Sequence, residues 1–255
     1  EAMILGTAGF TAALGLLRMT DNRQTPDLGP LAVTGATGGV GSLAVAIYSK
    51  AGYEVHAISG KPEHADYLKS LGASEVLGRE ALATTAPMAT VRFGGGLDNV
   101  GGTMLAALLA QTAPYGNVAS CGLAASPELH ATVMPFIIRG VSLLGVASAG
   151  TARDIRHEVW KRLASDWKPA DLDAICTREA TLDELPAVFE TMLAGGSLGR
   201  TVVRIHNPAW PACGHDGDRY NRLAYTGNPH GTHPDRRRLA LAADGHPPHR
   251  RKTRS

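Results

Sequence analysis

The sequence has few cysteines, and their spacing predicts neither a disulfide framework nor a metal site. Cys121, Cys176 and Cys213 are the only three in 255 residues, and they lie far apart with no C-x-x-C pair. Small disulfide-stapled scaffolds and structural zinc sites both need closely spaced cysteines. We therefore exclude both classes, assign no metal ligands, and expect a protein of the reducing cytoplasm.

Neither the charge nor the hydropathy of the sequence predicts a macromolecular or membrane partner. Only 19% of the residues are charged, and the net charge is +2. Residues 206–255 hold nine Lys or Arg against four Asp, whereas residues 1–205 have more acidic than basic side chains. The basic character belongs to one end of the chain, so we expect no nucleic-acid partner. We also find no signal peptide and no unbroken apolar run long enough to span a bilayer.

Hydrophobic residues make up 44% of the chain, and their spacing predicts the fold class. From Leu31 onward, short β-type runs alternate with helical stretches, which is the pattern of a parallel α/β sheet. We predict strands at 31–34, 54–59, 75–77, 97–100, 117–121, 141–146 and 200–205, and helices at 40–50, 62–71, 104–111 and 153–165. A last helix is predicted between the capping box Thr181-Leu-Asp-Glu184 and Gly195-Gly196. Residues 1–205 are thus predicted to form a doubly wound parallel sheet, and residues 1–17 are assigned no element.

Residues 206–255 differ in composition from the rest of the chain. They contain six of the ten histidines, six prolines and two basic clusters, Arg236-Arg-Arg238 and Arg250-Arg-Lys252. Such a segment buries too little apolar surface to offset the entropy of ordering it. We expect a disordered tail or the product of out-of-frame translation, with metal binding by the histidines as the alternative.

The segment Val33-Thr-Gly-Ala-Thr-Gly-Gly-Val-Gly41 predicts a dinucleotide site. Gly35, Gly38 and Gly41 have G-x-x-G-x-x-G spacing, one residue different from the G-x-G-x-x-G fingerprint. The physical needs are the same: a sharp turn, a close approach of the backbone to a pyrophosphate, and close packing of helix on sheet. Free N–H groups and the dipole of the following helix would then attract phosphate. A purely structural turn is the alternative.

The end of the second predicted strand favours NADP(H) over NAD(H). An NAD site would carry Asp or Glu here, to bind the ribose 2′-OH. This sequence has His56-Ala-Ile-Ser-Gly-Lys61, without an acid. Ser59 and Lys61 can bind a 2′-phosphate, with Arg79 as a third contact. An ordinary surface lysine after a strand is the alternative.

Several segments together resemble a known family. They are Met3–Ala12, Val33–Gly41, Tyr67–Ala73, Cys121–Ala124, Met134–Arg139 and Gly199–Val203. Taken in order from Glu1 to Ile205, they are similar to the acryloyl-CoA reductase branch of the zinc-independent, quinone-oxidoreductase-like medium-chain dehydrogenases/reductases. The resemblance implies hydride transfer from NADPH to acryloyl-CoA, giving propionyl-CoA. A quinone oxidoreductase and a non-catalytic NADP-binding fragment remain the alternatives, and a homodimer remains open.

The resemblance also implies the cofactor contacts, residue by residue. For the pyrophosphate they are Thr37, Gly38, Gly39 and Val40; for the 2′-phosphate, Ser59, Gly60, Lys61 and Arg79; for the nicotinamide end, Leu123, Ile137 and Ser148. Thr7 and Asn99 are weaker candidates near the nicotinamide. Enzymes of this family begin with a barrel-like catalytic domain, and nothing resembling it precedes Glu1. We therefore name no catalytic residue and expect the chain alone to be inactive.

Overall fold

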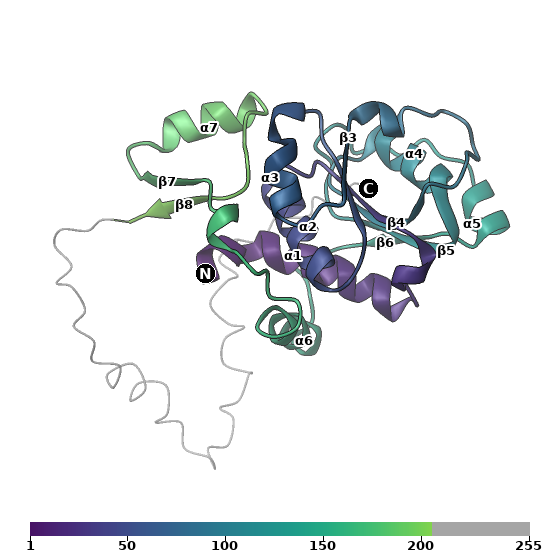
Figure 1. The fold of residues 1–255 in the computed structure, drawn as a ribbon, viewed down its shortest axis with the longest axis horizontal. Coiled ribbons are helices and arrows are strands. Elements are labelled where there is room, and N and C mark those ends of the chain that lie inside the picture. The colour runs from purple at the N-terminus through teal and green to yellow at the C-terminus, as the bar shows by residue number, and fades with distance from the viewer. Residues whose placement is uncertain (206–255) are drawn as a thin grey trace, which may run out of the picture. The chain divides into compact units, whose positions relative to one another are not determined.

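The computed structural model describes residues 1–205, and the expected tail at 206–255 lies outside these residues. A six-stranded parallel sheet has the order β3-β2-β1-β4-β5-β6. Its strands are β1 Leu31–Thr34, β2 Val55–Ile58, β3 Glu75–Leu77, β4 Phe93–Asp98, β5 Thr112–Ser120 and β6 Ser142–Gly145. Figure 1 labels strands β3, β4, β5 and β6 of this sheet. The strand order reverses between β1 and β4, and ligands of such sheets bind outside the carboxyl ends of the strands at that point.

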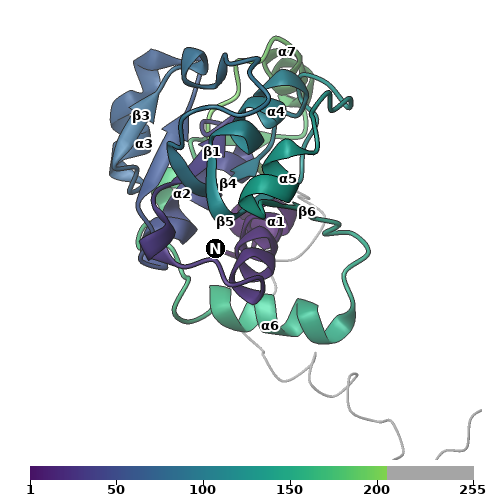
Figure 2. The same ribbon diagram turned by 90° about the vertical axis from the view of Figure 1, so that its right-hand side faces the viewer.

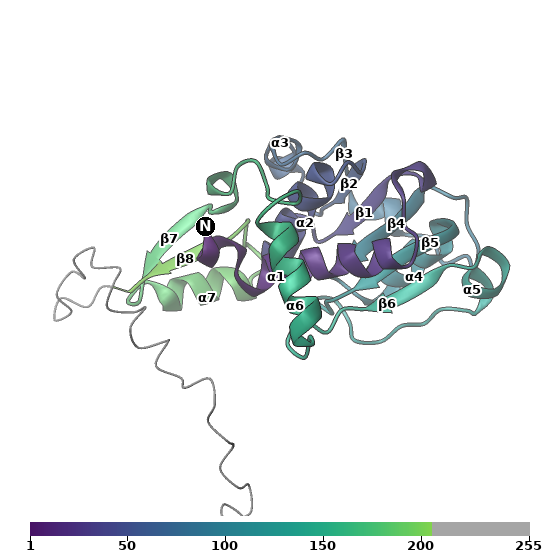
Figure 3. The ribbon, with the colours of Figure 1, turned by 90° about the horizontal axis from the view of Figure 1, so that it is seen from below.

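Helices connect the strands and cover the sheet. They are α1 Ala2–Asp21, α2 Gly39–Lys50, α3 Ala65–Ser70, α4 Gly102–Gln111, α5 Met134–Arg139, α6 Arg153–Leu163 and α7 Leu185–Leu193. Short 3₁₀ turns lie at Pro26–Leu28, Pro62–His64, Arg79–Leu82 and Asp173–Ile175. After α6, β7 Arg178–Thr181 and β8 Thr201–Arg204 form a separate parallel pair next to α7 (Figure 3).

The two faces of the sheet contact two separate apolar clusters. Leu31 and Val33 of β1 belong to the cluster with α1, α2 and α6, whereas Ala32 between them belongs to the cluster with α4. Successive side chains of a strand point to opposite faces, so both faces of the sheet are covered. Figure 2 shows α6 beneath α1 and apart from α4 and α5. The predicted doubly wound α/β fold is confirmed.

Helix α1 is the largest departure from the sequence prediction, which assigned its residues no element. Thirteen of its twenty residues are buried, and the Tyr48 hydroxyl of α2 donates a hydrogen bond to the Ala12 carbonyl at 3.0 Å. A helix that is apolar on most sides shows no amphipathic period, and its Gly and Thr lower helix propensity. By length and hydropathy α1 could also span a membrane, whereas the sequence analysis found no apolar run long enough to do so. In the structure, however, 67% of the apolar 18-residue stretch of α1 is buried within the domain.

Smaller departures have local causes. Strand β4 begins at Phe93 and not at the predicted residue 97, because Gly94 to Gly96 have low strand propensity and were left out of the prediction. In the structure they lie where a Cβ would overlap neighbouring backbone, so glycine is required there. The predicted helix at 62–71 divides into a 3₁₀ turn and α3, and α5 and β7 had no predicted counterpart. In the capping box, the Thr181 N–H donates to the Glu184 carboxylate at 2.7 Å as predicted. The Thr181 hydroxyl donates to the same carboxylate, at 3.0 Å, instead of accepting from backbone.

Candidate functional site

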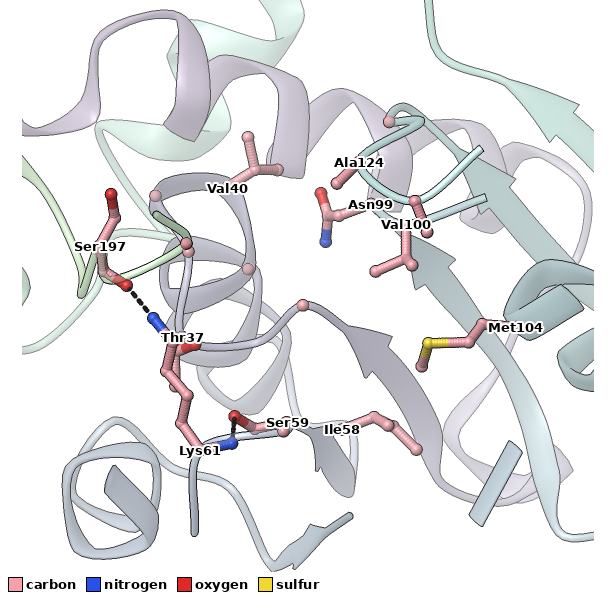
Figure 4. A pocket seen from close by; sticks show the side chains of 18 of the residues that line it. Thr37, Val40, Ile58, Ser59, Lys61, Asn99, Val100, Met104, Ala124 and Ser197 are labelled. Atoms are coloured by element: carbon pink, nitrogen blue, oxygen red, sulfur yellow. Dashed lines mark hydrogen bonds between the residues drawn. The ribbon is translucent and has the colours of Figure 1, made fainter. Parts of the chain in front are cut away.

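A cavity of about 720 Å³ lies at the carboxyl ends of β1, β2, β4 and β5, where the strand order reverses (Figure 4). It is lined by nine of the eleven residues predicted to contact the cofactor: Thr37, Gly38, Gly39, Val40, Ser59, Gly60, Lys61, Arg79 and Leu123. Asn99, a weaker candidate, also lines it. Segments separated by more than 80 residues therefore meet at one site.

The glycine loop between β1 and α2 needs each of its three glycines for a different reason. Gly35 has φ +60° and accepts a hydrogen bond from the Gly38 N–H at 3.0 Å, which closes the turn. Gly38 precedes α2, and no side chain caps the helix there, so the first N–H groups of α2 are free to bind a ligand. A Cβ on Gly41 would overlap the Gly35 carbonyl oxygen and lie 2.7 Å from the Ala36 Cα. Gly41 is therefore required for close packing of α2 on the turn.

Replacing Gly41 with Ala is expected to destabilise the fold. The atoms that the new methyl group would meet belong to backbone, so the turn itself must move, at a cost of about 1–3 kcal/mol. Thermal unfolding followed by circular dichroism should show a lower Tm, by roughly 2–4 °C for each kcal/mol. Gly150→Ala is the control, because a Cβ there meets nothing within 4 Å. An unchanged Tm for Gly41→Ala would contradict this account of the turn.

Cationic and hydroxyl groups gather where β2 ends. The buried Ser59 hydroxyl accepts a hydrogen bond from the Lys61 N–H at 3.0 Å. The Lys61 ammonium donates to the Ser197 carbonyl at 2.6 Å, and Gly60 leaves room for the Arg79 side chain beside it. None of the described residues lining the cavity is acidic. This end of the cavity is therefore suited to an anion.

A hydrogen-bond network joins the ends of β1 and β4 beneath the cavity. The Thr34 hydroxyl donates to Asp98 at 2.8 Å and accepts from the Asn99 N–H at 2.9 Å. The Asn99 side chain donates to the Thr34 carbonyl at 2.7 Å. Burial raises the pKa of the Asp98 carboxyl, while hydrogen bonds from Thr34 and from backbone N–H groups oppose that rise. The network holds Asn99 in one orientation at the cavity wall.

Cys121 is part of this network and not a reactive thiol. Its Sγ lies 3.2 Å from the Asn99 Oδ1, to which it donates. Burial, with the nearby Asp98 second, raises the pKa of the Cys121 thiol to about 12. A cysteine nucleophile reacts as thiolate, so Cys121 stays protonated and unreactive at neutral pH.

Two predicted nicotinamide contacts, and one weaker candidate, lie outside the cavity wall. Ile137 lies on α5 with 74% of its surface exposed, and Ser148 follows β6, where its carbonyl accepts from Arg156 at 3.2 Å. Thr7 is on α1, where its carbonyl accepts from the Thr11 hydroxyl at 2.7 Å. The structure does not bring these three to the cavity, and their contacts with a cofactor stay predictions.

Sequence reasoning missed the wall contributed by the end of α7 and by the segment between α7 and β8. Met192, Gly195 and Ser197 line the cavity, although the glycines there were interpreted only as a helix stop. Arg200 follows, with its guanidinium 3.2 Å from where a Cβ on Gly39 would lie, so it places positive charge beside the start of α2. These contacts join residues more than 130 apart in sequence, and no local pattern signals them.

Comparison with known proteins agrees with this geometry. The family model described as "Zinc-binding dehydrogenase" matches residues 39–165. Among residues 1–205, no group of three or more His, Cys, Asp or Glu is placed to hold a metal ion. The match begins at the start of α2 and includes β2 to β6, whereas β1 and Gly35 to Gly38 precede it.

Individual relatives cover about 80% of this chain. "Putative quinone oxidoreductase YhfP" of Bacillus subtilis is 47% identical over 207 residues, 80% of this chain and 63% of that protein. "Acrylyl-CoA reductase AcuI" of Ruegeria pomeroyi is 45% identical over 81% of this chain and 63% of its own length. The crystal structure of E. coli K-12 YhdH with bound NADPH superposes with a TM-score of 0.77 at 43% identity, over 81% of this chain and 64% of that one. The B. subtilis protein was solved with NAD bound, also at a TM-score of 0.77, over 80% of this chain and 63% of that one. The chain thus spans less than two thirds of these relatives.

Proposed function

Because the chain belongs to the quinone-oxidoreductase-like branch of the medium-chain dehydrogenase/reductase superfamily, which includes the acryloyl-CoA reductases, we propose that it is the NADPH-binding part of a cytoplasmic reductase. Its substrate is a small molecule with an activated double bond, and acryloyl-CoA is the leading candidate. One observation carries the choice of cofactor: Ser59, Lys61 and Arg79 meet at an acid-free end of the cavity, beside the glycine loop. Residues 1–205 then form the dinucleotide-binding unit.

The residues present fit NADPH along the length of the cavity. At one end, Lys61 and Arg79 supply positive charge and Ser59 a hydroxyl for the 2′-phosphate. In the middle, the uncapped N–H groups of α2 face the pyrophosphate, and Gly38 lets the backbone approach it. At the other end, Asn99 offers polar contacts and Leu123, with Ala124 and Ala125, an apolar wall for the nicotinamide.

The residues of this chain would bind and orient the cofactor. When bound, NADPH would supply the hydride that reduces the acyl double bond. Asn99 is fixed by its bonds to Thr34 and Cys121, so it would hold the nicotinamide end without reorganising. Leu123, which lines this end of the cavity, would cover one face of the ring. No described residue is assigned as proton donor.

Replacing Gly38 with Val is expected to abolish cofactor binding while leaving the fold intact. A Cβ at this position would have only the Gly35 carbonyl oxygen within 4 Å, at 3.3 Å, so a shift of a few tenths of an ångström in the turn admits it. The side chain would then occupy the space of the phosphate. Titration of NADPH by fluorescence should show at least a hundredfold weaker affinity, with Tm changed little. Normal affinity for NADPH in Gly38→Val would place the pyrophosphate elsewhere.

Deuterium transfer tests the reaction class. The chain is joined, just before Glu1, to the catalytic domain of an acryloyl-CoA reductase and supplied with NADPH deuterated on the transferred position. Propionyl-CoA carrying one deuterium at its β-carbon is the expected product. A folded chimera that oxidises NADPH with quinones but not with acryloyl-CoA would favour the quinone oxidoreductase alternative, which the similarity to YhfP supports.

A further inference from the structure

Three consecutive residues between α7 and β8 each bond to a different part of the domain. The Ser197 carbonyl accepts from the Lys61 ammonium at 2.6 Å (Figure 4), and the Leu198 carbonyl accepts from the Thr177 hydroxyl. The Gly199 N–H donates to the Thr37 carbonyl at 2.9 Å. We call residues 197–199 the bridge segment, because it joins the loop after β2 to the glycine loop after β1.

The bridge segment therefore connects the two positions at which the domain would bind phosphate. Thr37 and Lys61 both line the cavity; under the proposed function the loop of Thr37 would face the pyrophosphate, and Lys61 would face the 2′-phosphate. In NADPH both groups are attached to the same ribose, at its 2′ and 5′ oxygens, so the protein must hold its two binding positions at a matching separation. A free lysine has four rotatable side-chain bonds and would not hold this position by itself.

The hydrogen bond to Ser197 restrains Lys61 without using up its capacity to bind. An ammonium group has three N–H donors, and one of them is taken by the Ser197 carbonyl. Two remain for phosphate oxygens. Part of the side-chain entropy that phosphate binding would otherwise cost is thus lost already on folding.

We propose that the bridge segment is a determinant of cofactor specificity, which positions Lys61 for the 2′-phosphate and thereby sets the preference for NADPH over NADH. This rests on the proposed NADPH-binding function and extends it to residues 197–199. These residues are far in sequence from the end of β2, the position that usually determines the choice between NADPH and NADH. Ser197 and Gly199 are positioning residues, because they act through Lys61 and the glycine loop.

Gly199 is packed closely against other residues of the domain. Its φ is +53°, a left-handed conformation that favours glycine. A Cβ there would lie 2.5 Å from the Ile175 carbonyl oxygen and 2.8 Å from both Thr177 Cγ2 and the Tyr67 hydroxyl. An alanine at 199 must therefore displace the bridge segment, and the Ser197 carbonyl with it.

The test compares the dissociation constants of NADPH and NADH in matched variants. Gly199→Ala is expected to lower the preference for NADPH at least fivefold. Gly52→Ala is the control for left-handed strain, since Gly52 has φ +89°, no atom within 4 Å of a Cβ, and no place in the cavity. Thr177→Val removes the bond to Leu198 from an exposed position and should lower the preference in the same direction, which keeps the test valid if Gly199→Ala does not fold.

A double-mutant cycle separates positioning from general damage. In a Lys61→Met background, Gly199→Ala and Thr177→Val should change the NADPH preference less than twofold, because the group they position is gone. Equal losses for NADPH and NADH, or the same loss of preference with and without Lys61, would overturn the proposal. If the unaltered protein binds both cofactors equally, the proposed preference for NADPH is itself wrong, and the bridge segment then has no such preference to set.

Discussion

Lys61→Glu is expected to invert the cofactor preference of the protein. The unaltered chain should bind NADPH at least tenfold more tightly than NADH, about 1.4 kcal/mol. The substitution replaces an attraction for the 2′-phosphate with a repulsion and also removes the donor to the Ser197 carbonyl. It creates, in addition, the carboxylate that NAD sites use to bind the ribose 2′-OH. NADPH affinity should fall at least a hundredfold, about 2.7 kcal/mol, and NADH affinity should fall much less or rise.

Fluorescence titration of both cofactors at one fixed ionic strength measures this result, because salt screens the charge involved. Lys50→Glu makes the same change in charge at an exposed position in the last turn of α2, outside the cavity, and should leave both affinities nearly unchanged. One structure of a relative contains NADPH and another contains NAD, so family membership alone does not determine which cofactor this chain prefers. Equal affinities in the unaltered chain would refute the 2′-phosphate assignment.

The parts of the site that could be predicted from sequence are those made by short segments. The glycine loop and the end of β2 each combine a strand, a turn and a characteristic residue within about ten positions, and both line the cavity. β1 and β3 have the predicted bounds, and each strand is followed directly by a glycine, Gly35 and Gly78. Local patterns were sufficient wherever backbone chemistry alone determines the conformation.

The parts that could not be predicted depend on contacts between distant segments. Helix α1 is buried by α2, the sheet and α6, so its sequence lacks the polar face that marks most helices. The bond between Lys61 and Ser197 joins residues 136 positions apart, and Ser197 contributes only its backbone carbonyl. A backbone acceptor has no sequence signature, since any residue could supply it. Family resemblance named Lys61 but not the group that holds it.

A polypeptide of these 255 residues is expected to bind NADPH and yet to reduce acryloyl-CoA very slowly. Binding depends on the glycine loop, Lys61 and the bridge segment, all of which are present in the described domain. Reaction also needs an acyl thioester held against the nicotinamide. A misplacement of about 1 Å already costs on the order of a hundredfold in rate. Leu123 is 64% exposed at this end of the cavity, so the described residues leave one side of the reaction open to water.

The chimera with a catalytic domain from an acryloyl-CoA reductase is the reference for this prediction. NADPH affinity of the 255-residue polypeptide should lie within about threefold of the chimera's, because both share the same contacts. Its kcat/KM for acryloyl-CoA should be at least a hundredfold lower, about 2.7 kcal/mol of lost transition-state stabilisation. Gly38→Val in the chimera should remove turnover by removing the cofactor, which shows that the activity comes from this domain's site. Comparable turnover by the 255-residue polypeptide would mean that its own residues complete the acyl site, and the search for a proton donor would then turn to the residues around Leu123.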